Sequence, residues 1–236
     1  MGDGHYQVSS KTIPLVAEPP SSANRVADGY GSVKIDAARA ARQGRNSHMT
    51  FYGNKELADS FRTVRKNTLA IAEDIPEDKY GFRPAPDSRS VAELLRHIAV
   101  TTSSHFDMYA DKKMTSFVGF DWGAYMQQTQ QAEQRLETKA QIVDALRSSG
   151  DQWASYVGSL SDAEQERFIT FSNEGVPPGK TRFETILSVK EHEMHHRGQL
   201  MVLERMLGIV PHLTRQMQER WSAAAAAAPK AKSVGA

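Results

Sequence analysis

Four capping boxes mark helix starts along this chain. In such a box a Ser or Thr at the N-cap is followed three residues later by Glu or Gln, and each side chain accepts a hydrogen bond from the other residue's backbone N–H. The four pairs are Ser90/Glu93, Thr138/Gln141, Ser161/Glu164 and Thr181/Glu184. No alternating apolar and polar pattern of the kind that strands show accompanies them. The sequence therefore predicts an all-α protein.

Apolar residues at helical spacing give the extents of the helices. Leu57, Phe61, Val64 and Ile71 predict a first helix over about 55–73, which ends before Pro76 because proline disfavours helical geometry in the preceding residue. Further helices are expected over about 90–110, from 138 through at least 157, and over 181–208, with a shorter one near 213–228. The stretch 111–136 mixes loop and helix. These lengths predict a four-helix bundle with a long crossover connection.

Both ends of the chain differ from this middle part. Residues 1–49 contain no Phe or Trp and only one Leu, so we expect a disordered extension. The tripeptide Ser47-His48-Met49 is typical of a vector junction, and a native flexible extension is the alternative. The bundle is predicted over residues 50–222. Residues 223–236 form an Ala-rich tail.

Composition excludes several classes of function. The 236 residues include 29 Lys and Arg against 28 Asp and Glu, a net charge of +1, which argues against nucleic-acid or anionic-membrane binding. Cysteine is absent, so disulfides, thiolate nucleophiles and iron–sulfur clusters are excluded. No apolar run approaches the roughly 20 residues of a membrane span, and no secretory signal is present. We therefore expect a soluble, cytoplasmic protein.

Histidines provide the strongest chemical signal. At about 100° per residue, His192 lies about 40° from His196, so both imidazoles project from the apolar face of the last long helix, whereas His195 lies on its flank. Buried imidazoles need partners, and a divalent metal would satisfy both. The candidate for a third ligand is His97, on a helix where the small residues Thr101 and Ser104 would leave room beside the metal for water and substrate. Three protein ligands with one open position are typical of a catalytic metal.

Other interpretations of these residues remain open. The three histidines could be ordinary hydrogen-bonded core residues. His192, Glu193 and His196 also match the H-E-x-x-H pattern of zinc metalloproteases, in which the glutamate is the general base. Alternatively, Glu193 could belong to a charged, solvated helix face.

Three blocks of sequence resemble the DinB/YfiT-like family of metal-binding helical bundles. They are Tyr80-Gly81-Phe82-Arg83-Pro84, the helix segment Ser90–Ile98, and His192-Glu193-Met194-His195-His196-Arg197-Gly198-Gln199-Leu200. The resemblance covers about residues 55–208. It implies a four-helix bundle, often dimeric, that holds a divalent metal such as zinc or nickel on His97, His192 and His196. It also implies, for some members, thiol-dependent transferase or isomerase activity with low-molecular-weight thiols.

Three functional hypotheses follow. The first is a metal-dependent enzyme, a thiol transferase or a related hydrolase or isomerase, which acts on a small molecule and in which His195 or Glu193 assists proton transfer. The second is a metal-stabilised, non-enzymatic stress-response bundle whose partner surface includes Phe117, Phe120 and Trp122. The third is the metalloprotease. A homodimer is expected, and imidazole ligands alone leave the metal's identity open.

Overall fold

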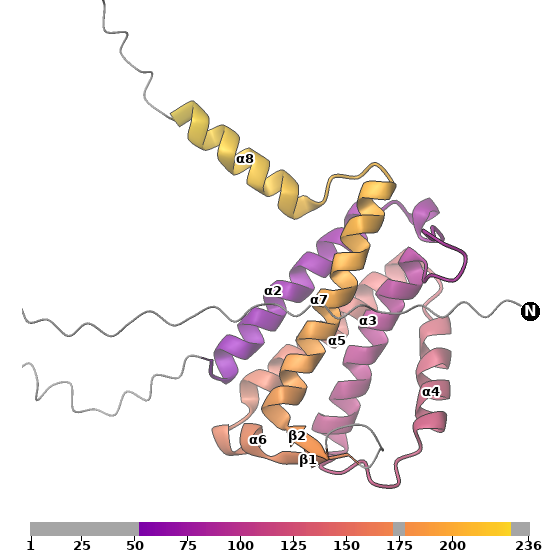
Figure 1. Ribbon diagram of the computed structural model, residues 1–236, viewed down its shortest axis with the longest axis vertical. Helices are drawn as coiled ribbons and strands as arrows, with labels where there is room; N and C mark the ends of the chain where they lie inside the picture. Colours follow the sequence, from indigo (N-terminus) through magenta and orange to yellow (C-terminus); the bar gives the residue numbers. More distant parts are fainter. Residues whose placement is uncertain (1–51, 172–177, 228–236) are drawn as a thin grey trace, which may run out of the picture. The chain divides into compact units, whose positions relative to one another are not determined.

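The computed structural model describes residues 52–171 and 178–227 (Figure 1). The expected extension over residues 1–49 and most of the Ala-rich tail lie outside these residues. Within them the chain forms seven α-helices, which are α2 (Asn54–Asp74), α3 (Val91–Phe106), α4 (Trp122–Gln134), α5 (Lys139–Ser159), α6 (Asp162–Glu166), α7 (Arg182–Met206) and α8 (His212–Ala227). No helix in this described part is long and apolar enough to cross a membrane.

The predicted helix boundaries are confirmed. All four capping boxes form, and in α3 the Ser90 backbone N–H donates to Glu93 Oε2 at 2.8 Å while the Glu93 backbone N–H donates to Ser90 Oγ at 3.2 Å. The first helix ends where Ile75 becomes extended ahead of Pro76. The last long helix is followed by Gly208 at φ +79°, a left-handed conformation that glycine adopts without strain.

The four long helices α2, α3, α5 and α7 form the bundle. Helices α2 and α3 each pack against both α5 and α7, so the two consecutive helices α2 and α3 lie diagonally across the bundle (Figure 1). The segment between α3 and α5 carries α4, which packs against α3. This arrangement confirms the all-α class and the long crossover connection.

Three short features were not predicted. Helix α3 continues into a π-helical turn, η2 (Asp107–Asp111), and a 3₁₀ turn, η1 (Glu77–Lys79), follows α2. A two-stranded antiparallel ribbon pairs β1 (Phe168–Thr170) with β2 (Gly179–Thr181), in register Ile169 opposite Lys180. Each strand has only three residues, too few for an alternating pattern to be recognised in the sequence.

The core consists of two apolar clusters, one toward each end of the bundle. Representative residues of the first are Ile71, Leu95, Ile98, Leu146 and Leu200, and of the second Phe61, Met108, Trp153, Val157 and Val189. Along each long helix a buried polar residue falls between the members of one cluster and those of the other. These polar residues are Arg65, Thr68, Thr102, Ser149 and Glu193.

Arg65 links all four long helices through this polar layer. Its guanidinium on α2 donates to Thr102 Oγ1 of α3 at 2.9 Å, to the Leu146 carbonyl and Ser149 Oγ of α5, and to both carboxylate oxygens of Glu193 on α7 at 2.8 Å.

Gly150 makes the close approach of this guanidinium possible. A Cβ atom at position 150 would lie 2.7 Å from Arg65 Cγ and 2.9 Å from Arg65 Nη1. Both distances are shorter than van der Waals contact allows, so any larger residue at position 150 would displace the arginine.

The aromatic residues expected at a partner surface instead pack together. Phe117 is 2% exposed and stacks on both Trp122 and Phe171, with ring centroids 5.4 Å apart in each pair. Phe120 and Trp122 are half-buried against the same cluster. The ring of Phe117 is therefore covered by its aromatic neighbours, and an interface near these three residues stays a prediction.

A buried carboxyl near the end of α7 predicts a pH-dependent stability. Burial, and next the charge of nearby Asp74, raise the pKa of Glu204 from 4.5 to about 7, and neither carboxyl oxygen has a hydrogen-bond partner among the described residues. At pH values between 4.5 and about 7, the Glu204 carboxyl keeps its proton in the folded protein, whereas in the unfolded chain it has released that proton. The stabilising contribution is therefore complete below pH 4.5 and is lost as the pH rises through 7.

Comparison with Glu204→Gln isolates this effect. We expect the free energy of unfolding of the unmodified protein to fall by about 2–3 kcal/mol relative to the variant between pH 5 and pH 8. Urea unfolding at both pH values measures the difference. A constant difference between the two proteins across this range would contradict the prediction.

Candidate metal centre

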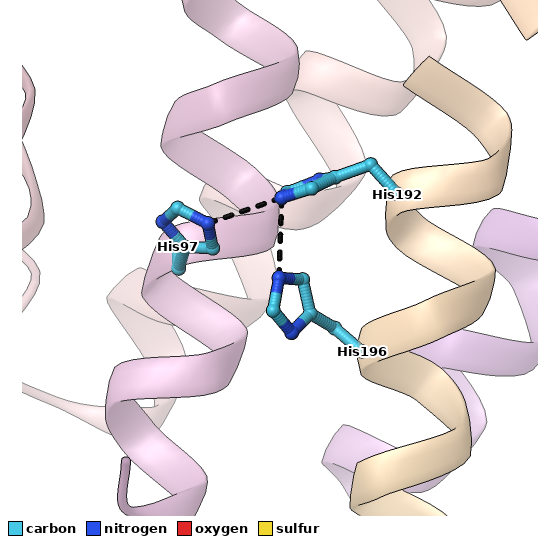
Figure 2. Close-up of side chains that lie close together, drawn as sticks. All are labelled: His97, His192 and His196. Carbon is cyan, nitrogen blue, oxygen red and sulfur yellow. Dashed lines mark hydrogen bonds between the residues drawn. The ribbon is translucent and has the colours of Figure 1, made fainter. Parts of the chain in front are cut away.

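Three imidazoles from two helices converge at one point. His97 lies on α3, and His192 and His196 lie one turn apart on α7 (Figure 2). The Nε2 atom of His192 is 3.1 Å from the Nε2 atom of His97 and 3.1 Å from that of His196. The structure therefore brings together all three predicted ligands, whose candidate ligand atoms lie within 4.8 Å of one another.

Hydrogen bonds on the far side of two rings orient them. His97 Nδ1–H donates to Glu133 Oε1 of α4 at 2.9 Å, and His196 Nδ1–H donates to Gln199 Oε1 at 2.8 Å. A proton on Nδ1 leaves the Nε2 lone pair free, and a carboxylate partner makes the imidazole a stronger ligand. Sequence reasoning missed both partners.

Burial keeps the central imidazole neutral. It lowers the pKa of His192 to about 3, with further lowering from the adjacent His196 and His97 rings, and it also lowers the pKa of His196. Only the neutral imidazole can bind a metal. At neutral pH both α7 histidines are therefore available as ligands without losing a proton first.

The donor set fits a divalent cation. Nitrogens about 2.0–2.1 Å from a tetrahedral zinc ion lie roughly 3.3 Å apart, close to the 3.1 Å contacts of His192. One proton on Nε2 of His192 could satisfy only one of these two contacts, whereas a shared cation satisfies all three nitrogens. The three-histidine set also leaves a fourth coordination position without a protein ligand.

A cavity borders the three histidines. A cavity of about 740 Å³ is lined by His97 and His192, together with Thr101 and Glu133. The small Thr101 therefore lies beside the cluster as expected, whereas Ser104 lines a separate cavity near Met108. A small molecule entering the larger cavity would meet the two imidazoles directly.

Glu193 and His195, which are adjacent to the ligands in sequence, do not lie in the histidine cluster. Glu193 is 1% exposed, and its carboxylate is bound by Arg65 and by Thr68 Oγ1 at 2.7 Å. It lies neither on a charged surface nor free to act as a base, so the metalloprotease interpretation and the proton-transfer role of Glu193 are wrong. His195 is exposed, and its Nε2 lies 3.2 Å from Gln199 Nε2, outside the cluster.

A known protein family matches the part of the chain that carries this cluster. The sequence pattern of the DinB superfamily matches residues 60–200. The chain belongs to the DinB superfamily. That match includes all three histidines of the cluster, and it confirms the family resemblance recognised in the sequence.

Individual DinB relatives are distant. The chain is 23% identical over 156 residues to the uncharacterized protein YjoA of Bacillus subtilis (strain 168), covering 66% of this chain and 91% of YjoA. The crystal structure of YjoA, a DinB-like protein, matches 65% of this chain and 92% of its own at 21% identity and a TM-score of 0.48. A conserved protein from Enterococcus faecalis matches 63% and 93% at 15% identity and a TM-score of 0.47.

Proposed function

We propose that this DinB protein is a metal-dependent enzyme that transfers a small thiol to an electrophilic substrate. The observation that carries the proposal is the convergence of three imidazoles beside a large cavity. A structural metal site would instead be closed by four protein ligands. Zinc and nickel are the proposed metals because the family resemblance implies them, and imidazole suits both.

The chain's own residues would hold the metal and shape its surroundings. His97, His192 and His196 would be the ligands, and Glu133 and Gln199 would fix the orientation of two of them. A bound divalent cation favours the thiolate form of a coordinated thiol at neutral pH. The cavity next to His97 and His192 would hold the thiol with its sulfur directed toward the cluster.

The transfer itself requires no redox partner. The thiol releases its proton to solvent, the sulfur forms a bond to an electrophilic carbon, and the bond from that carbon to the leaving group breaks. The leaving group departs with the electron pair of that bond. His195 is exposed near the rim of the cluster, which supports at most a role in passing the proton outward.

A steady-state assay tests this function. We expect zinc- or nickel-loaded protein to consume low-molecular-weight thiols in the presence of an alkylating electrophile such as 1-chloro-2,4-dinitrobenzene, well above the uncatalysed rate. His97→Ala should remove this acceleration by loss of a ligand. Equal rates for the loaded protein and the variant across a panel of thiols and electrophiles would contradict the proposal.

We further propose that the protein is a homodimer. Val202 and Met206 share an outward side of α7 at 57% and 54% exposed, and Met217 and Trp221, four residues apart on α8, are 49% and 67% exposed. A second copy would cover these side chains. Light scattering after size exclusion should give twice the chain mass, and Trp221→Glu should lower it. A monomer at tens of micromolar would contradict this.

A further inference from the structure

The large cavity beside the histidines carries two arginines that lack acidic partners. Its lining includes Arg83, Arg89 and Arg96. Arg83 is already bound by Glu93, with contacts of 2.6 Å and 2.5 Å. Within residues 52–171 and 178–227, by contrast, neither Arg89 nor Arg96 forms an ion pair.

Arg96 is the less satisfied of these two guanidinium groups. Its Nη2 donates to the Glu137 carbonyl at 3.3 Å, and its Nε is buried without a hydrogen-bond partner in the described part of the chain. A buried donor that lacks an acceptor is costly unless a ligand supplies one. Arg89 is exposed and makes no hydrogen bond to any described residue.

The lining of this cavity carries three arginines and three acidic residues, and they differ in which of them are paired. Glu93 is held by Arg83, and Glu133 is held by His97. Asp87 is the remaining acidic side chain in the lining, and it is exposed. Arg83 and Glu93 thus form an ion pair, whereas Arg89 and Arg96 each lack a carboxylate partner within residues 52–171 and 178–227.

A second cavity borders the cluster at His196 and differs in character. It measures about 440 Å³ and is lined by His196 and Gln199 together with apolar residues such as Leu94, Val202 and Leu203. Arg89 lines both cavities. An apolar part of a substrate would therefore contact His196, and a charged part would lie in the cavity beside His97 and His192.

We propose that Arg89 and Arg96 form an anion-binding subsite that selects thiols carrying a carboxylate or phosphate group. Guanidinium groups bind such oxyanions through paired, charge-assisted hydrogen bonds. The anionic group lies against the arginines while the sulfur reaches His97 and His192 in the same cavity. The apolar cavity at His196 remains for the electrophile. The identification of the ligand as a thiol rests on the proposed function, whereas the anion subsite does not.

The first experiment titrates metal-free protein with succinate and with inorganic phosphate at low salt, followed by NMR. We expect saturable binding that Arg96→Gln and Arg89→Gln each weaken about tenfold or more, with Arg96→Lys intermediate. Arg62→Gln removes the same charge from the exposed side of α2 and should bind as the unmodified protein does. Whichever anion binds more tightly identifies the group that the subsite takes.

The second experiment compares thiols on zinc-loaded protein by calorimetry. Mercaptosuccinate should bind at least tenfold more tightly than 2-mercaptoethanol, and the two arginine variants should abolish that preference without changing metal content. Unchanged anion binding in both variants would overturn the subsite. Arginine-dependent succinate binding combined with no metal-dependent binding of either thiol would overturn the proposed function and leave the subsite standing.

Discussion

Replacement of Glu193 by glutamine should destabilise the protein by about 3–5 kcal/mol, because it leaves the Arg65 charge buried without compensation. The two side chains are 5% and 1% exposed and make two hydrogen bonds of 2.8 Å. Thr68 holds the same carboxylate. Urea or thermal unfolding measures the loss. Glu191→Gln, two residues away on the exposed side of α7, should change stability by less than about 0.5 kcal/mol.

A double variant shows how much of this loss comes from leaving one charge of the Arg65–Glu193 pair buried without its partner. Arg65→Met together with Glu193→Leu removes both charges, and it should be less destabilised than either single replacement. If each single variant unfolded as easily as the unmodified protein, the polar layer would not hold the helices together. If Glu193→Gln were folded but had lost the metal, Glu193 would belong to the centre rather than to the bundle.

Replacement of His192 by alanine should abolish metal binding, because His192 supplies the nitrogen that contacts both others at 3.1 Å. Elemental analysis should fall from about one zinc per chain to a small fraction. The stabilisation that zinc gives, about 2.7 kcal/mol at a hundredfold excess over its dissociation constant, should disappear with it. Thermal unfolding with and without a chelator measures that loss.

Metal binding by two further variants tests the same assignment. His195→Ala removes a histidine of the same motif that lies outside the cluster, and it should retain one metal per chain. Glu133→Gln keeps all three ligands but weakens the hydrogen bond to His97, so the metal affinity should fall by about 10- to 100-fold. Full occupancy in His192→Ala, or equal losses in His195→Ala and His192→Ala, would rule out the three-histidine assignment.

The helices and the three ligands could be predicted from the sequence because their signals are local. A capping box needs only four residues, and His192 and His196 share a face by helical geometry alone. His97 could be chosen as the third ligand through its position on another helix and through the family resemblance. The structure confirms that these three residues come together.

The surroundings of the ligands could not be predicted, because their partners are distant in sequence. Glu193 has an acidic side chain in a charged stretch, which favours a solvated position, and only Arg65, 128 residues earlier, makes its burial possible. Glu133 lies on α4, which buries no residue fully and therefore has a weak apolar pattern. Gln199 does lie three residues after His196, a spacing that could have indicated their contact.

Gly150 has a consequence for how the metal would arrive. Its lack of a side chain lets the Arg65 guanidinium lie against α5 and hold Glu193, the residue next to His192. Contacts within the protein thus hold α7 at this level. We therefore expect the three histidines to be in place before an ion binds, unlike in small zinc domains that fold only around their metal.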